Sequence, residues 1–308
     1  MAKNKINYRK KYFVTVITSI LLITILIFLS SCSSSGSESN AYIEQQHKTG
    51  FQGLEISLED NRPPDGVLSG RNYDMSIRLV NKGAFDISDG KLSILGFDER
   101  YVGIYHAVDV NFPTDSNFLR GNEIMGFDGD QTMLSFDLFI NELEEGKETE
   151  HQSYFVTASY NYYAELSETI CINPGAGDIS YDVHGSGCSD ADSYLRIKGQ
   201  GSPISVTEVE AIPSSGSEIE LRITFENGGN GEAEKLTLVK ANLGHESLNC
   251  EFRKGEGNSI EFDSDYDQEV ELVCRKIVES SVAYPTTLFL EFTYDYTTFL
   301  EKRLTIEN

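Results

Sequence analysis

The sequence predicts an all-β protein made of two tandem antiparallel β-sandwiches that follow an N-terminal hydrophobic segment. After residue 50, apolar and polar residues alternate with a period of two in most runs, as they do in half-buried strands. Two stretches of the chain repeat the same order of elements. No segment after residue 50 has the apolar spacing of an amphipathic helix. With 308 residues, the chain is long enough for about two domains.

The N-terminus has the features of a secretory signal. Residues 1–12 contain five basic residues and no acid, and residues 13–29 are apolar apart from four Ser or Thr. The sequence Leu29-Ser30-Ser31-Cys32 resembles the lipobox of prokaryotic lipoproteins, in which the cysteine, here Cys32, is lipid-modified and becomes the mature N-terminus. The alternative for residues 1–32 is an uncleaved signal anchor, because an apolar run of this length spans about 25 Å as a helix.

Both predictions place the protein at the cell envelope, anchored in the membrane with residues 33–308 outside the cytoplasm. Residues 33–50 then form a Ser-rich stalk. Without residues 1–31 the chain has 20 basic and 49 acidic residues, a formal charge of −29. This charge excludes a general nucleic-acid binder, which needs a basic surface. It is typical of a solvated surface that resists aggregation, and it would also attract a divalent cation or a basic partner.

The strands are expected where the alternation is clearest, with turn residues between the runs. Turn signals such as Asn81-Lys82-Gly83 and Asp89-Gly90 separate them. Short strands with this spacing and these turns are typical of β-sandwiches. The clearest alternating runs are residues 73–79, 154–162, 219–225, 270–274 and 288–296.

An internal repeat divides the exported part. Residues 159–172 align without a gap to residues 293–306, at an offset of 134. Further upstream, residues 77–83 resemble residues 222–229. We therefore predict one sandwich in residues 51–173 and a second in residues 203–308, joined by a Gly-, Ser- and Asp-rich linker over residues 174–202. Each copy is predicted to end on a hairpin, with a Tyr-x-Tyr strand leading out and an Ile-x-Ile strand returning.

Four tyrosines occupy matching positions in the two copies: Tyr160, Tyr162, Tyr294 and Tyr296. This repetition favours a structural role, with the ring inside and the hydroxyl at a rim. A carbohydrate-stacking platform would instead need exposed rings.

Five cysteines agree with an exported protein. If Cys32 is the lipid site, four remain, and an even number outside the cell indicates two disulfides. We predict the local pairing, because each pair then lies inside one structural unit. Zinc is the competing interpretation, but the spacing lacks Cys-x-x-Cys and a histidine that could complete a site. The predicted disulfides are Cys171–Cys188 and Cys250–Cys274.

The sequence contains no recognisable catalytic motif, and we expect no enzymatic activity. His245-Glu246 is not continued to a His-Glu-x-x-His motif, and neither a Gly-x-Ser-x-Gly turn nor a phosphate-binding loop occurs. No cofactor is predicted, with Ca²⁺ as the one candidate. Hard carboxylate oxygens suit Ca²⁺. A solvated acidic turn is the simpler interpretation of the candidate residues Asp263, Asp265 and Asp267.

The first copy has a longer middle, from Gly96 to Asp130, than the second. Long loops on a rigid sandwich often carry binding residues, although such a connection can also be only padding. The candidate binding residues of this region are Asp98, Tyr101, His106, Asp128 and Asp130.

A strand that ends in Asn-x-Gly, as at Asn81-Lys82-Gly83 and Asn227-Gly228-Gly229, resembles the CARDB-type and related immunoglobulin-like domains of bacterial and archaeal surface proteins. The stretch from Gly199 to Thr207 is similar to surface proteins of small-genome archaea. The resemblance covers most of residues 51–308 and implies extracellular sandwiches without catalysis. It supplies no functional residues.

The predicted function is that of a tethered, structural or adhesive protein with immunoglobulin-like domains, which contacts other envelope or surface proteins. The alternative is a ligand- or Ca²⁺-binding accessory lipoprotein of an envelope transport or secretion complex.

Overall fold

The computed structural model describes residues 48–105, 109–114, 117–122, 129–174, 188, 193–214, 217–262, 269–280 and 282–308. The predicted signal or anchor segment, Cys32 and most of the predicted stalk lie outside these residues. Within the described part of the chain, no helix is both long enough and apolar enough to cross a membrane. The described residues from 48 onward belong to one compact unit.

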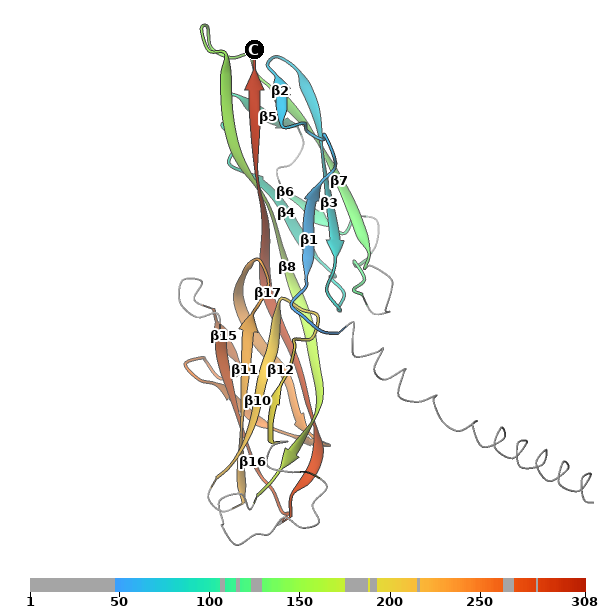
Figure 1. The fold of residues 1–308 in the computed structure, drawn as a ribbon, viewed down its shortest axis with the longest axis vertical. Coiled ribbons are helices and arrows are strands. Elements are labelled where there is room, and N and C mark those ends of the chain that lie inside the picture. The colour runs from blue at the N-terminus through green and yellow to red at the C-terminus, as the bar shows by residue number, and fades with distance from the viewer. Residues whose placement is uncertain are drawn as a thin grey trace, which may run out of the picture. The chain divides into compact units, whose positions relative to one another are not determined.

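The predicted all-β, antiparallel class is confirmed (Figure 1). A four-stranded sheet has the order β1 (Leu54–Leu58), β3 (Asn72–Asn81), β7 (Gln131–Ile140), β5 (Val102–Tyr105). A five-stranded sheet has the order β14 (Asn249–Phe252), β16 (Glu269–Ile277), β11 (Glu218–Asn227), β10 (Ile204–Pro213), β9 (Tyr194–Arg196).

The third sheet faces both of the others. Its order is β13 (Glu246–Ser247), β12 (Glu232–Leu243), β17 (Tyr284–Glu307), β8 (Thr149–Ile172), β4 (Gly90–Leu95), β6 (Asp109–Phe112). In addition, β15 (Ser259–Glu261) pairs with β12, and β2 (Gly66–Leu68) pairs with β17. The pair β2–β17 is parallel, in contrast to the other pairs described.

The alternation in sequence becomes alternation in burial. In β7 every second side chain is buried and the others are exposed, as the two-residue period of a strand dictates. In β11 the side chains of Ile219, Leu221, Ile223 and Phe225 point into the core. Complete burial of one such side chain stabilises the fold by about 1.5–3 kcal/mol. Alternation is therefore the main local reason why these segments are strands.

The predicted terminal hairpins are wrong. Each Tyr-x-Tyr and Ile-x-Ile stretch forms one uninterrupted strand, and β8 and β17 pair with each other along 24 residues, from Thr149↔Glu307 to Ile172↔Tyr284. Figure 1 shows the two strands side by side over their whole length. A tight hairpin needs residues that accept positive φ, such as Asn-Gly, and the segment from Tyr160 to Leu166 contains neither glycine nor proline. The chain therefore stays extended.

The paired strands β8 and β17 serve two sandwiches. In sandwich one, the four-stranded sheet faces β4, β6, residues 149–160 of β8 and residues 297–307 of β17. In sandwich two, the five-stranded sheet faces β12, residues 284–296 of β17 and residues 161–172 of β8. The end of each long strand therefore lies in the sandwich opposite to the one in which that strand begins. The two sandwiches therefore do not end at residues 173 and 308, as predicted, because each sandwich contains the end of a strand that begins in the other.

The long middle of the first copy is not a single loop, as the sequence had suggested. It contains β5, which extends the four-stranded sheet, and β6, which extends the large sheet beside β4. These strands were missed because each has only four residues, too few for alternation to be recognised.

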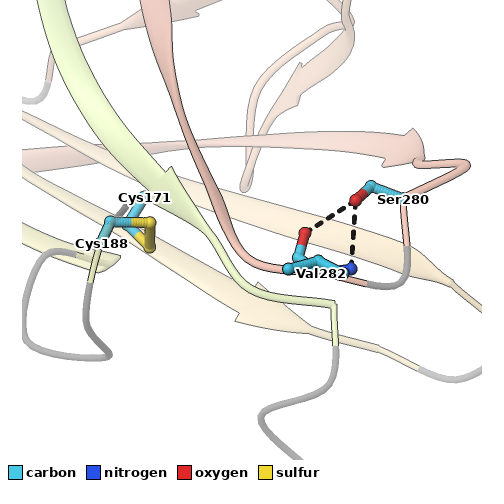
Figure 2. The surroundings of a disulfide bond; sticks show 4 residues. All are labelled: Cys171, Cys188, Ser280 and Val282. Atoms are coloured by element: carbon cyan, nitrogen blue, oxygen red, sulfur yellow. Dashed lines mark hydrogen bonds between the residues drawn. A yellow bond between two sulfur atoms is a disulfide. The ribbon is translucent and has the colours of Figure 1, made fainter. Parts of the chain in front are cut away.

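The two predicted disulfides are present. Cys250 and Cys274 are direct partners on β14 and β16. Cys171, at the end of β8, is joined to Cys188 (Figure 2). Figure 2 also shows Ser280 and Val282, which precede β17: the hydroxyl of Ser280 donates to the carbonyl of Val282 and accepts from its N–H. The disulfide thus secures β8 where that strand pairs with the beginning of β17.

Candidate functional site

The most elaborate arrangement of side chains lies midway along β8 and β17, where the two sandwiches meet. Tyr160 is paired with Tyr296, and Tyr162 is paired with Tyr294. All four rings are buried, with at most 4% of each residue exposed. We call these four residues the tyrosine cluster. The rings lie inside, as predicted, and cannot form an exposed stacking platform. The prediction that the hydroxyls lie at a rim is wrong, because they are buried together with the rings.

The rings contact one another across both strands and along each of them. Centroid distances are 5.9 Å for Tyr160–Tyr296 and 5.7 Å for Tyr162–Tyr294. Along β8, Tyr160 and Tyr162 are 5.8 Å apart in an edge-to-face arrangement. Such aromatic pairs contribute about 0.5–1.5 kcal/mol beyond the area that they bury. The cluster therefore joins the cores of the two sandwiches.

Each hydroxyl accepts a hydrogen bond from a backbone N–H of a different segment. In sandwich one, Tyr160 Oη accepts from Leu54 N at 3.2 Å, and Tyr162 Oη accepts from Phe85 N at 3.2 Å. Leu54 is the first residue of β1, and Phe85 follows the turn after β3. The second repeat does the same for sandwich two. Its hydrogen bonds are Ile204 N to Tyr294 Oη at 3.2 Å and Gly231 N to Tyr296 Oη at 2.8 Å.

Burial controls the ionisation of the cluster. Loss of hydration raises the pKa of Tyr296 to about 12. The same cause raises the pKa of Tyr160, Tyr162 and Tyr294 above the usual range of a phenol. The four hydroxyls therefore stay neutral hydrogen-bonding groups to a higher pH than an exposed tyrosine would.

The Asn-x-Gly turns belong to the same arrangement. Asn81, which is fully buried, donates from Nδ2 to the carbonyls of Phe85 at 2.8 Å and Leu119 at 3.0 Å. Asn227 donates from Nδ2 to the carbonyl of Gly231 at 3.1 Å and accepts from Tyr296 Oη at 3.2 Å. In both copies the asparagine thus binds the carbonyl of the residue four positions later, whose N–H binds a tyrosine of the cluster.

A short segment before β10 also lies at the junction. Ala84 N donates to Gly201 O at 2.7 Å, and Gly201 N donates to Gly50 O at 2.9 Å. A Cβ added at Gly199 would lie 2.4 Å from Gly50 O, so the backbones approach too closely for a side chain. Gln200 is buried, with its side chain bonded to the N–H and carbonyl of Val206. Sequence reasoning missed this role, although the Gly-Gln-Gly-Ser-Pro stretch was visible as a signal.

An open groove of about 670 Å³ crosses the outer face of the large sheet at the level of the tyrosine cluster. On its floor, Ser159 and Thr297 share a hydrogen bond of 2.8 Å between their hydroxyls. Asn161 donates from Nδ2 to Asp295 Oδ1 at 3.0 Å. The described lining residues include no histidine or cysteine, and neither hydroxyl has a base as its hydrogen-bond partner. The groove can accept a polar ligand, but these residues form no nucleophile–base pair.

The candidate binding residues of the 96–130 region do not converge. Tyr101 is buried near the end of β7, where its hydroxyl accepts from Lys147 Nζ at 3.0 Å. Asp98 is bonded to Arg100, which holds the pKa of that carboxyl below its usual range. Asp130 precedes the opposite end of β7 and accepts from Arg120 N at 3.2 Å. The ten residues of β7 separate these groups by about 30 Å.

The other candidates cannot be placed. His106 and Asp128 lie outside the described residues, as do Asp263, Asp265 and Asp267. Within the described ranges, no group of three or more His, Cys, Asp or Glu side chains could hold a metal ion.

No protein-family model and no curated protein matches this chain. Among solved structures, a chain of a type I cohesin–dockerin complex from Clostridium thermocellum is 11% identical, covering 36% of this chain and 83% of its own, with a TM-score of 0.23. The secreted serine protease VesC from Vibrio cholerae is 12% identical, covering 83% of this chain and 50% of its own, with a TM-score of 0.22. These scores are too low to carry an argument about fold or function.

Proposed function

We propose that this chain is a membrane-anchored protein of the cell envelope that makes structural or adhesive contacts with other envelope proteins and catalyses no reaction. The observation that carries this proposal is the continuous β8–β17 pair, which joins both sandwiches through 24 paired residues. Two sandwiches with a flexible linker would move independently. Here the tyrosine cluster and the long strands hold them in one arrangement, as suits a protein whose role is to keep contact surfaces in place.

The anchoring part of the proposal rests on the sequence. The basic, apolar and small-residue order of residues 1–32 supports an exported chain with Cys32 as its lipid site or with an uncleaved anchor. The two disulfides agree with an oxidising compartment outside the cytoplasm. Replacement of Cys32 by Ser should abolish incorporation of a labelled fatty acid while the chain is still exported. An uncleaved anchor would show no incorporation in either chain.

The domain class is proposed from the two Asn-x-Gly turns. In both copies the asparagine of an Asn-x-Gly turn, Asn81 or Asn227, binds the backbone carbonyl of the residue four positions later. This shared arrangement supports immunoglobulin-like sandwiches of the CARDB type.

The charge defines the partner that we expect. Residues 33–308 carry a formal charge of −29, which attracts a basic surface over a distance limited by salt. Electrostatic attraction of this kind mainly accelerates association and selects partners. We therefore expect a partner with a basic face and an interaction that weakens as ionic strength rises.

Crosslinking of intact cells, followed by mass spectrometry of the peptides joined to residues 48–308, tests the function. Crosslinks to further copies of the chain or to an abundant envelope protein are expected, and fewer should form at high salt. A deletion strain should show weaker attachment or an altered envelope. If no envelope protein were joined and the deletion changed neither property, the proposal would be wrong.

The groove of about 670 Å³ supports a second candidate, an accessory lipoprotein that binds a ligand or Ca²⁺ for a transport or secretion complex. A ligand that binds only the folded state raises its melting temperature. The test for Ca²⁺ is the melting temperature with and without the ion, compared with a variant in which Asp263, Asp265 and Asp267 are all Asn. Equal shifts in both chains would eliminate the acidic turn as the site.

A further inference from the structure

The two long strands exchange their ends between the sandwiches. From residue 161 onward, β8 lies beside the first half of β17 in sandwich two, where Leu166 and Ile170 are buried. From residue 297 onward, β17 lies beside the first half of β8 in sandwich one, where Leu304 and Ile306 are buried. Each sandwich thus contains one strand end that belongs to the other repeat.

Sandwich one holds the end of β17 firmly. Thr305 N donates to Asp65 O at 2.8 Å, Ser69 N donates to Glu307 O at 2.8 Å, and Asn308 N donates to Glu148 O at 3.1 Å. Ile306 is also paired with Val67 of β2. These partners all come from the first repeat, although β17 belongs to the second.

The exchanged ends are equivalent to each other. Leu166, Ile170 and Ile172 of β8 correspond to Leu300, Leu304 and Ile306 of β17 at the offset of 134. Either end therefore carries the apolar pattern that fills the same position in either sandwich. If β8 turned back at Asn161 and β17 turned back at Asp295, each strand would form a hairpin with itself. Each sandwich would then contain only strands of its own repeat. The structure instead keeps both crossing points extended.

We infer that the chain is an internally strand-exchanged pair, in which the two repeats are obligate partners and each sandwich is completed by the end strand of the other. Exchange of identical elements between protomers is a known route to dimers. Here both protomers are parts of one polypeptide. Because the linker holds the repeats together, the internal exchange has an effective concentration in the millimolar range, and a second copy of the chain competes poorly.

Four exposed residues distinguish exchange from hairpins: Ser153, Thr169, Thr287 and Arg303. In the exchanged structure Ser153 is paired with Arg303, and Thr169 is paired with Thr287. In the hairpin arrangement the same residues would instead be paired as Ser153 with Thr169 and Thr287 with Arg303. Two-cysteine variants of all four combinations therefore form a matched set on the same positions.

The test uses the full-length chain with a protease site inserted after Ser189, so that cleavage separates the repeats but leaves Cys171–Cys188 intact. After mild oxidation and cleavage, S153C/R303C and T169C/T287C should each join the two pieces in a band that a reductant separates. S153C/T169C and T287C/R303C should form no new disulfide in peptide mapping. The opposite result, with disulfides inside each piece and none between the pieces, would overturn the inference.

Cleavage without added cysteines gives an independent measurement. The two pieces should elute together in equal amounts in size-exclusion chromatography and should separate only in denaturant. Two folded pieces that elute separately in native buffer would also contradict the inference. Neither result depends on the proposed envelope function, because both are measured on the isolated protein.

Discussion

Sandwich one and sandwich two share a frame and differ in how they secure an edge strand. In sandwich two, β14 is joined to β16 by Cys250–Cys274. In sandwich one, the corresponding edge strand β5 pairs with β7 without a cysteine. The residues directly before β5 are held by two contacts. The ring of Tyr101 is buried, with Lys147 Nζ 4.5 Å from its centroid. Asn141 Nδ2 donates to the carbonyl of Arg100 at 3.0 Å.

Both repeats therefore keep the same junction, and they differ at their edge strands. Both copies keep an asparagine turn and two tyrosine hydroxyls bonded to backbone N–H groups. The edge strands are stabilised differently: a disulfide holds β14, whereas the contacts of Tyr101 and Asn141 hold the residues before β5. Variants at the junction and at each edge strand can separate what each of them contributes to stability.

The largest effect is expected at alkaline pH, which should unfold both sandwiches together. In an unfolded chain a tyrosine ionises near pH 10, whereas burial raises the pKa of Tyr296 to about 12 in the folded chain. Above about pH 10 the unfolded state therefore releases protons that the folded state keeps, and the free energy of unfolding falls as pH rises. This stabilisation is complete below about pH 10.

Ultraviolet titration of tyrosinate, run together with circular dichroism, measures this effect. The absorbance of the buried tyrosines should appear in the same pH range as the loss of strand signal. Ionisation of all 16 tyrosines near pH 10 with the strand signal intact would contradict it.

Removal of one ring of the tyrosine cluster should destabilise the whole protein, whichever sandwich its hydroxyl serves. Tyr162→Ala and Tyr294→Ala should each cost about 3–5 kcal/mol, as for other buried aromatic residues. The matched variants Tyr162→Phe and Tyr294→Phe keep the ring but leave Phe85 N or Ile204 N without its acceptor, at about 1–3 kcal/mol. Denaturant unfolding should show one transition in every variant. Two separate transitions would mean that the sandwiches unfold independently.

Loss of the Cys250–Cys274 disulfide should affect one edge. The chain-entropy model assigns about 3 kcal/mol to a loop of this length. In the double variant Cys250→Ala/Cys274→Ala, hydrogen exchange should become faster in β14, while β5 of sandwich one keeps its protection. Equal loss of protection in β5 and β14 would show that the edges are coupled through the junction.

The two asparagines should differ by a smaller amount. Asn81 is fully buried and donates to two carbonyls, whereas Asn227 is partly exposed. Asn81→Ala leaves buried groups unpaired and should cost about 2–3 kcal/mol, against about 1 kcal/mol for Asn227→Ala, which water can partly compensate. Thermal unfolding of both variants measures the difference, and a larger loss for Asn227→Ala would reverse this interpretation.

The sequence was sufficient for the strand class, both disulfides and the burial of the tyrosines, because period-two alternation and repeated positions are local signals. It was not sufficient for the path of β8 and β17. A strand that continues past Tyr162 and a strand that turns back there bury the same side chains, so alternation alone cannot distinguish them. The absence of glycine and proline between Tyr160 and Leu166 was the sequence signal that favours one uninterrupted strand.

The candidate site was less predictable than the fold. Asp98 and Tyr101 were grouped with Asp130 because they are close in sequence, but β7 places them at opposite ends of sandwich one. The groove at the junction combines residues from both repeats, such as Asp89 and Glu234. A site made by two distant segments leaves no spacing pattern in one sequence.

The place where the chain enters this body has a mechanical consequence. Gly50 N donates to Lys198 O at 2.6 Å, and Leu54 N donates to Tyr160 Oη at 3.2 Å, so the beginning of the described chain meets the body midway along β8. On either side an arm of about twelve residues, or about 40 Å, extends from that point. Under the proposed anchorage, the tether is attached to the body near the middle of β8 and not at one of its ends. A partner that pulls on one arm then exerts a torque about the junction, and two partners that pull on opposite arms balance each other.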